Sequence, residues 1–251
     1  MKTYHIHLVR HGFTTANLEG KYCGETDLPL CEEGEQNLYE ITEQADYPYA
    51  ELVYVSPLQR ARQTASILWP ECEQIIIEGL REASFGPFEG KSFAELRGNE
   101  EFERWVVPGS KYVPEGVEEQ QAFFKRCSKA FEYIVEDMMA KSVYDAAVVT
   151  HAGVIGNILS GLAYPKKAPY DWQCQPGCGF TVVVDPSLYL REPVIEVVDY
   201  VPRFDDDEYE RPEYDNFVVE HDDECSDECD CGRDGDCSGD AHYFVYLFNY
   251  Y

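Results

Sequence analysis

Hydrophobic residues occur in short runs along the chain, separated by longer segments in which apolar residues recur with helical spacing. Apolar runs of about four to eight residues bounded by turn signals are typical of buried strands. Such runs lie at residues 4–9, 51–55, 74–77, 145–150, 180–185 and 194–199. Helical patterns occupy residues 32–44, 56–69, 117–140 and 151–161, and two glycine-punctuated loops precede the helix at 117–140.

Strands that alternate with helices indicate an α/β fold. We expect a three-layer α/β/α sandwich with a largely parallel central sheet. Ser56 and Pro57 follow the second strand, and we expect them to begin a helix as its N-cap and first helical residue. Ligands of such sheets bind at the carboxyl ends of the strands, so residues placed there are candidates for function.

Three predicted strands end at residues suited to phosphate chemistry. Arg10, His11 and Gly12 follow the first strand, Arg60 comes soon after the second, and His151 follows the fourth. Arginine offers a fork of donors that fits phosphate oxygens. Imidazole is a nucleophile that works near neutral pH. Gly12 is expected to let a substrate approach the backbone.

Five segments resemble, in order, the motifs of the histidine phosphatase superfamily, which has the phosphoglycerate mutase-like fold. They are LVRHGFTTAN (8–17), YCGETDLPLCEEG (22–34), SPLQRARQTA (56–65), LREASFGPFEG (80–90) and VVTHAGVIGNIL (148–159). The resemblance covers roughly residues 1–200. It implies phosphomonoester chemistry through a phosphohistidine, with no metal and no cofactor, because arginines serve as the charge sink.

The resemblance also implies roles for single residues. His11 matches the nucleophile, and Glu82 matches the acid that protonates the leaving oxygen and later activates water. The phosphate pocket, which neutralises the charge on the transferring oxygens, is matched by Arg10, Asn17, Arg60 and His151.

Neighbouring residues compete for two of these roles. Arg60 and Arg62 lie two positions apart on one helix, so they point about 200° apart and only one can face the pocket. The register of the motif favours Arg60 and leaves Arg62 on a solvated face. Glu78 and Glu89 compete with Glu82 for the role of the acid, and the motif favours Glu82. Arg81 is left without an assigned role.

Two positions depart from the family pattern without touching the central chemistry. Phe13 stands where the signature commonly has Glu, and Cys31 stands where Thr usually caps the next helix. Cysteine is a poorer helix cap than threonine.

The short run between Glu82 and Glu89 resembles the compact phosphatase branch of the family, which includes α-ribazole phosphatases. The predicted function is therefore a phosphomonoesterase for a small phosphorylated metabolite, such as α-ribazole 5′-phosphate or a sugar phosphate. The alternative is a 2,3-bisphosphoglycerate-dependent phosphoglycerate mutase. Two further alternatives are a non-catalytic scaffold on the same fold and a metal-dependent hydrolase. The latter would use His5 and His7, whose His-x-His spacing is a zinc-ligand pattern; packing under the flanking helices is the competing interpretation.

The net charge of −28 is concentrated towards one end of the chain. Residues 205–240 hold 17 acidic residues against two arginines, a local net of −15 that leaves −13 for the rest. So acidic a surface repels nucleic acid and anionic membranes, which we do not expect as partners. It also repels phosphate esters, so a phosphate site needs its own local positive charge.

The chain is predicted to divide into a catalytic domain at 1–203 and an acidic tail at 204–251. The tail contains four of the ten cysteines and ends in an aromatic segment. We expect the tail to be largely disordered, and it is a candidate docking segment for a protein partner. No signal sequence is recognisable at the N-terminus, so we expect a cytoplasmic protein. The sequence leaves the oligomeric state open.

Overall fold

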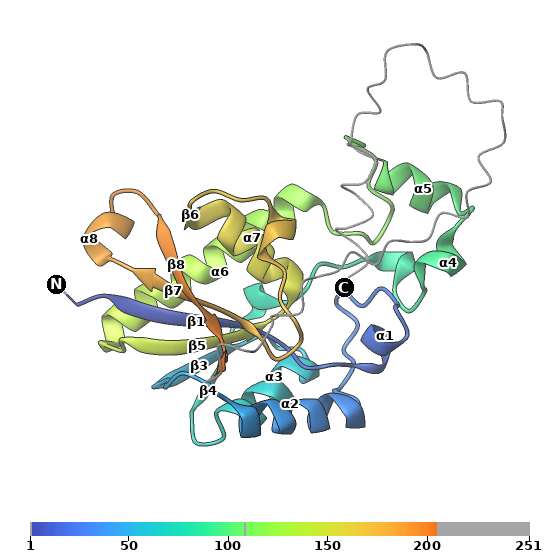
Figure 1. Ribbon diagram of the computed structural model, residues 1–251. Helices are drawn as coiled ribbons and strands as arrows, with labels where there is room; N and C mark the ends of the chain where they lie inside the picture. Colours follow the sequence, from blue (N-terminus) through green and yellow to red (C-terminus); the bar gives the residue numbers. More distant parts are fainter. Residues whose placement is uncertain (1, 108, 205–251) are drawn as a thin grey trace, which may run out of the picture.

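A seven-stranded sheet forms the middle layer of the computed structural model, which describes residues 2–107 and 109–204 (Figure 1). The strand order is β4-β3-β5-β1-β7-β8-β6. Strand β7 runs antiparallel to both of its neighbours, whereas the other pairs in the sheet are parallel. The strands are β1 (Tyr4–Arg10), β3 (Leu52–Val55), β4 (Gln74–Ile76), β5 (Asp145–Thr150), β6 (Ala163–Tyr164), β7 (Gly179–Val184) and β8 (Ile195–Val201).

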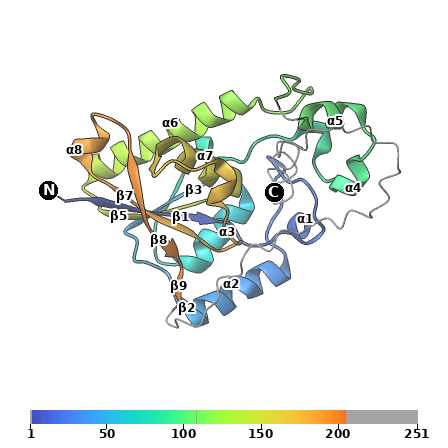
Figure 2. The same ribbon diagram turned by 45° about the horizontal axis from the view of Figure 1, so that its top comes forward.

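Helices cover both faces of this sheet and complete the three layers (Figures 1 and 2). One face carries α6 (Gln120–Lys141) and α7 (Ala152–Leu162), and the other carries α2 (Glu32–Gln44) and α3 (Gln59–Leu68). The predicted α/β/α sandwich with a largely parallel sheet is thus confirmed. The remaining elements are α1 (Thr15–Leu18), β2 (Ala45–Asp46), η1 (Glu78–Leu80), η2 (Gly86–Phe88), α4 (Phe93–Leu96), α5 (Glu100–Val106), η3 (Pro169–Trp172), α8 (Pro186–Tyr189) and β9 (Arg203–Phe204).

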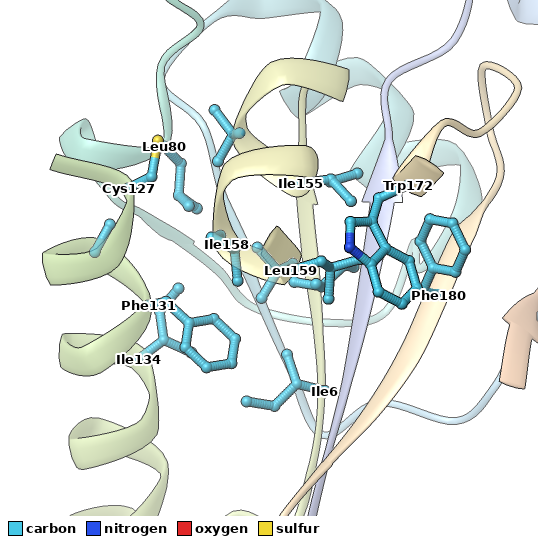
Figure 3. Close-up of a cluster of buried hydrophobic side chains, with 14 of the residues drawn as sticks. Ile6, Leu80, Cys127, Phe131, Ile134, Ile155, Ile158, Leu159, Trp172 and Phe180 are labelled. Atoms are coloured by element: carbon cyan, nitrogen blue, oxygen red, sulfur yellow. The ribbon is translucent and has the colours of Figure 1, made fainter. Parts of the chain in front are cut away.

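Hydrophobic cores lie on both sides of the sheet because the side chains of a strand alternate between its faces. In β1, Ile6 and Leu8 enter the core beneath α6 and α7, whereas Val9 enters the core beneath α2 and α3. Phe131 and Ile134 of α6 meet the first of these cores (Figure 3). Fully burying such side chains contributes roughly 1.5–3 kcal/mol each, so these cores fix the strands whose ends form the site.

Two helix starts differ from the sequence prediction. Helix α3 begins at Gln59 with Leu58 as N-cap, so the prediction that Ser56 caps it was wrong. The Ser56 hydroxyl instead forms a hydrogen bond of 2.8 Å with the His151 ring. Helix α6 begins at Gln120 rather than at Val117, because Val117 forms a bridge with Phe85 across the neighbouring loop.

Helix α2 begins at Glu32, with Cys31 as its N-cap. The Cys31 side chain accepts no hydrogen bond from the first turn of that helix. It lies instead 3.5 Å from the carbonyl oxygen of Phe13. The side chain of Cys31 therefore contacts the segment after His11 instead of capping α2.

The segment expected to contain loops forms two short helices beyond the carboxyl end of the sheet (Figure 1). Ser92 and Glu95 form a reciprocal capping box at the start of α4, and Asn99 caps α5. Aromatic residues of these helices pack with Phe88 of η2, whose ring stacks on that of Trp105 at 5.3 Å between centroids. This small aromatic unit lies on the side of the sheet where parallel-sheet sites form.

The predicted boundary between residues 203 and 204 falls within β9 (Arg203–Phe204), which pairs antiparallel with β2. The expected tail lies outside the described residues apart from Phe204, so its predicted disorder stays a prediction. No helix in the described ranges is both long enough and apolar enough to cross a membrane.

Candidate active site

The ends of three adjacent strands bring the predicted residues together. Strands β3, β5 and β1 are neighbours in that order, and their carboxyl ends lie at one edge. The His11 amide donates to Thr150 O at 2.9 Å, and the Ser56 amide donates to Val149 O at 3.0 Å. The rings of His11 and His151 lie 5.0 Å apart between centroids, in an edge-to-face arrangement. The sheet topology therefore builds the site.

His11 is held in the tautomer that leaves Nε2 free to react. Its Nδ1 lies 2.7 Å from the carbonyl oxygen of Gly12. A carbonyl oxygen only accepts hydrogen bonds, so Nδ1 carries the proton and Nε2 carries the lone pair. Burial lowers the pKa of His11 well below its ordinary value of 6.5, and the charges of Arg60 and Arg10 lower it further. The imidazole is therefore neutral and nucleophilic at neutral pH.

Gly12 was expected to let a substrate approach the backbone, but the structure shows a packing requirement for glycine at this position. A Cβ at this position would lie 2.8 Å from Leu38 Cδ1 of α2. The Gly12 amide also donates to Thr64 Oγ1 at 2.9 Å, which ties the segment after β1 to α3. The glycine thus permits close packing of α2 beside His11.

Arg60 is a buried positive charge at the site. Its Nη1 donates to Thr26 O at 2.8 Å and its Nη2 donates to Gly24 O at 2.6 Å. Among the described residues, no carboxylate lies within ion-pair distance of Arg60, and its charge remains available for an anion. Arg62 is exposed, whereas Arg60 is fully buried, as the register of the motif predicted.

Arg10 directly precedes His11 in the chain and is also buried. Its Nη1 donates to the carbonyl oxygen of Cys174 at 3.0 Å. Both arginines lower the pKa of His11, because a nearby positive charge disfavours the protonated imidazole. Arg10 and Arg60 are therefore candidates for the local positive charge that an acidic protein needs in order to bind phosphate.

His151 faces His11 from the N-terminus of α7. Its Nε2 shares the hydrogen bond with Ser56 Oγ, and its Nδ1 is buried without a protein partner among the described residues. The Nε atom of Arg60 is buried and unpartnered in the same way. Burial lowers the pKa of His151 well below 6.5, with further lowering by the charge of Arg60. Buried polar atoms without partners are rare, and here they are consistent with a polar ligand at the site.

Glu82 lies beside this group with only 3% of its surface exposed. Its Oε1 accepts from the Ala83 amide at 2.9 Å and its Oε2 accepts from the Gly153 amide at 3.0 Å. Burial raises the pKa of Glu82, against the lowering effect of these two amides and of Arg60. A carboxyl group with a raised pKa holds its proton at higher pH, as a general acid requires.

The two competing glutamates occupy other environments. Glu78 is exposed. Glu89 uses its carboxylate to join two loops, because Oε1 accepts from the amides of Glu25 and Phe85 at 3.1 and 3.0 Å. Its Oε2 accepts from the Thr26 amide at 2.8 Å. These contacts give Glu89 a structural task, whereas the Glu82 carboxyl group is bound to the Gly153 amide, two residues after His151.

Asn17 belongs to the capping box of α1. Its Oδ1 accepts from the amide and the hydroxyl of Thr14 at 2.9 and 2.8 Å. This arrangement leaves the Asn17 amide group to donate, so a supporting role in the phosphate pocket stays a prediction.

His5 and His7 lie in the first half of β1, away from its carboxyl end. His5 Nδ1 lies 3.1 Å from Asp145 Oδ1, and His7 Nδ1 lies 3.0 Å from Thr181 Oγ1. Burial lowers the pKa of His7 to about 4. Within residues 2–107 and 109–204, no three His, Cys, Asp or Glu side chains gather in a group that could hold a metal ion.

The structure adds residues that the sequence did not single out for these tasks. Ser56 holds the His151 ring, Thr64 holds the Gly12 amide, and Arg126 contacts the backbone around Glu82. Ser56 was placed at the correct strand end, and only its partner was missed. Arg126 lies on α6, far from every motif in sequence, and no local signal marks it.

Comparison with known proteins places the chain in a family. Residues 6–187 match the model of the histidine phosphatase superfamily (branch 1). The chain therefore belongs to the histidine phosphatase superfamily, and it is a phosphatase acting on a phosphorylated small molecule.

Individual relatives carry the names of both phosphatases and mutases. The adenosylcobalamin/alpha-ribazole phosphatase of Escherichia coli (strain K12) is 29% identical over 180 residues, which cover 68% of this chain and 85% of that protein. The "Probable phosphoglycerate mutase GpmB" of Escherichia coli O1:K1 / APEC is 34% identical over 132 residues, which cover 51% of this chain and 61% of that protein. The crystal structure of phosphoglycerate mutase from Bacillus anthracis str. Sterne matches with a TM-score of 0.62 at 20% identity, covering 79% of this chain and 92% of that chain. At that identity the match shows the fold alone, and it confirms the phosphoglycerate mutase-like fold.

Proposed function

We propose that this protein is a phosphoric monoester hydrolase that transfers the phosphoryl group to His11 and then to water. The observation that carries the proposal is the fixed tautomer of His11, whose free Nε2 lies among two buried arginines and a second histidine. A neutral nucleophile surrounded by positive charge suits attack on a phosphate ester.

Each step can be assigned to a residue. In the first step, the Nε2 lone pair of His11 bonds to phosphorus, the P–O bond to the leaving group breaks, and Glu82 gives its proton to the leaving oxygen. In the second step, the Glu82 carboxylate takes a proton from water, the water oxygen bonds to phosphorus, and the P–N bond breaks. Inorganic phosphate leaves, and His11 and Glu82 return to their starting states.

Arg10, Arg60 and His151 supply the charge stabilisation in this scheme. The transferring phosphoryl group spreads its charge over three oxygens, which positioned donors neutralise without reorganising. We propose that donors of these three side chains bind these oxygens. The unpartnered Nδ1 of His151 and Nε of Arg60 support that assignment. No metal ion is required for any of these steps.

The first substrate to test is α-ribazole 5′-phosphate. This choice rests on the relatives named as alpha-ribazole phosphatases, which cover most of both chains. Sugar phosphates form the second group. The mutase alternative is supported by the 34% identity with GpmB, and it predicts that turnover of a phosphoglycerate requires a bisphosphorylated primer.

The direct test is phosphate release from p-nitrophenyl phosphate in excess EDTA, with the native protein compared with His11→Asn. We expect activity that survives EDTA and is lost in the variant. Activity lost to EDTA would revive the metal-dependent alternative that uses His5 and His7. Activity retained by the variant would overturn the role of His11.

A second assay separates the hydrolase from the mutase and the scaffold. α-Ribazole 5′-phosphate, a panel of sugar phosphates and 3-phosphoglycerate with a 2,3-bisphosphoglycerate primer are compared under the same conditions. Conversion only in the primed reaction would favour the mutase. A folded protein that turns over none of these compounds, nor p-nitrophenyl phosphate, would favour the scaffold.

We also propose a cytoplasmic location and a protein partner for residues 204–251. Removing residues 205–251 tests the proposal that this segment binds a protein partner. Unchanged kinetics with lost association would support a docking role, whereas a chain that no longer folds would show that these residues complete the domain.

A further inference from the structure

Arg126 of α6 contacts the backbone segment that carries Glu82. Its Nη1 donates to Gly79 O at 3.0 Å and to Arg81 O at 2.7 Å. Its Nη2 lies 3.4 Å from Glu82 O. One guanidinium group therefore holds three carbonyl oxygens of the segment that enters the site.

The remaining carbonyl oxygen of this segment is held from the other side. Thr150 Oγ1, at the end of β5, donates to Leu80 O at 2.8 Å. The Leu80 side chain is fully buried in the same cluster as Cys127, the residue after Arg126 (Figure 3). Every carbonyl oxygen from residue 79 to residue 82 thus accepts a hydrogen bond from a side chain, in a segment that belongs to no strand.

Glu118 fixes the guanidinium group in turn. Arg126 Nε donates to Glu118 Oε1 at 3.0 Å, and Nη2 donates to Glu118 Oε2 at 2.5 Å. The Glu118 amide donates to Ser84 O at 2.9 Å, so this residue also holds the segment after Glu82. Both side chains are only about one-fifth exposed, at 20% and 21%. A two-point carboxylate pair fixes the orientation of an arginine as well as its position.

The close approach of the segment to α6 is built into the chain. A Cβ at Gly79 would lie 2.8 Å from the Cβ of Ala130, one turn along from Arg126. A glycine and an alanine at this contact bring the backbone within reach of the arginine fork. The arrangement therefore depends on Glu118, Arg126 and Ala130, which lie in none of the five motifs.

We propose that Arg126, oriented by Glu118, is the positioning residue for the general acid Glu82. The proposal rests on the proposed function, because it takes Glu82 as the group that protonates the leaving oxygen. Arg126 touches neither the substrate nor the reacting atoms; it acts by fixing the backbone from which the acid projects. Small displacements of a catalytic group lower the rate strongly, so loosening this backbone is expected to impair proton donation.

The leaving group provides a readout that a merely structural role would not move. An alkoxide is a poor leaving group and needs the proton from Glu82, whereas p-nitrophenolate leaves readily without it. The quantity to measure is kcat/KM for an alkyl phosphate divided by kcat/KM for p-nitrophenyl phosphate. This parameter reports the first phosphoryl transfer and is independent of the later hydrolysis of the phosphoenzyme.

The variants are Arg126→Met, Arg126→Lys and Glu118→Gln, with Glu82→Gln as the reference for loss of the acid. Proton transfer by a positioned acid contributes about 10²–10⁴-fold, and we expect Arg126→Met to lose roughly 10-fold or more on the alkyl phosphate and under about 3-fold on p-nitrophenyl phosphate. Arg126→Lys keeps the charge without the fork, so its ratio should lie between those of the native protein and Arg126→Met.

Asp137→Ala is the matched control on the same helix. Asp137 accepts from Tyr54 Oη at 2.8 Å and from Lys141 Nζ at 2.6 Å, so its replacement removes two side-chain hydrogen bonds of the same helix at a place outside the site. We expect the control to leave the ratio unchanged. Thermal melts of all variants show whether each is folded, and Arg126→Lys and Glu118→Gln decide the question if Arg126→Met does not fold.

Two outcomes would overturn the positioning role of Arg126. Equal losses of kcat/KM on both substrates in the folded variants would show that the contacts of Arg126 only stabilise the fold. Unchanged kinetics would show that Glu82 does not depend on Arg126 for its position. A Glu82→Gln variant with an unchanged ratio would instead remove the acid assignment of the proposed function. The two failures are therefore distinguishable.

Discussion

Replacing His11 by Asn changes how stability depends on pH, and the sign and size of the change follow from burial. The pKa of His11 is lowered in the folded protein, chiefly by burial and then by Arg60 and Arg10. At a pH below the ordinary pKa of 6.5, His11 binds a proton in the unfolded chain but stays neutral in the folded protein. His11 therefore costs the folded state increasing stability as the pH falls from about 6.5 towards its lowered folded pKa.

The magnitude can be worked out for two pH values. Between pH 7.5 and pH 5.5, an unfolded histidine with a pKa near 6.5 gains most of its proton while a folded one stays neutral. The stability lost through one such group is about 1.4 kcal/mol. Asn at position 11 carries no titrating proton, and its side-chain amide can still donate towards Gly12 O. His7 and His151, whose pKa values are also lowered, remain in the variant and cancel in the comparison.

The assay is urea denaturation of the native protein and His11→Asn at pH 7.5 and pH 5.5, at one ionic strength. We expect the variant to gain about 1.4 kcal/mol relative to the native protein on going to pH 5.5. A difference that is the same at both pH values would refute the reasoning that His11 is held neutral by burial.

Three further results are expected. Ser56→Ala removes the hydrogen bond to His151 Nε2 and should lower kcat/KM about 5- to 10-fold, equivalent to about 1–1.4 kcal/mol. The variant should still melt cooperatively, and an unchanged kcat/KM would show that Ser56 does not help to position His151. Gly24→Ala places a Cβ 2.1 Å from Ala83 O and 2.6 Å from Glu89 Oε1. We therefore expect roughly 1–3 kcal/mol of destabilisation and a loss of activity. A melting temperature and rates like those of the native protein would contradict the close packing of Gly24 against Ala83. Dialysis against EDTA should leave the activity of the native protein unchanged, and restoration by added Zn²⁺ or Mg²⁺ after a loss would contradict the metal-independent scheme.

Much of the site could be predicted because it depends on sheet topology and on local motifs. A parallel strand places the residue after it at a known edge, so His11 and His151 could be brought together from their positions alone. Helical geometry separated Arg60 from Arg62, and their burial agrees with that choice. The capping boxes of α1 and α4 are also local features. The Ser-x-x-Glu spacing of Ser92 and Glu95 predicts the start of α4 from the sequence alone.

The parts that were missed depend on contacts between distant segments. Ser56 was expected to cap a helix because Ser-Pro is a common helix start, but its hydroxyl bonds a ring 95 positions away. Arg126 is one polar residue among many on a long helix, and its task appears only when α6 packs against the segment around Glu82. Glu89 and Glu82 both follow the third strand, and only their burial and partners separate a structural carboxylate from a candidate acid.

The central claim is that the phosphoryl group passes through His11, and trapping the intermediate tests it most directly. The native protein and His11→Asn are mixed with a ³²P-labelled phosphate ester, quenched in alkali within one turnover, digested and analysed for phosphopeptides. Phosphohistidine is stable in alkali and labile in acid. The account predicts alkali-stable label on the peptide that contains His11 in the native protein and none in the variant. An active native protein that carries no label on His11, or that carries it on another residue, would contradict the account.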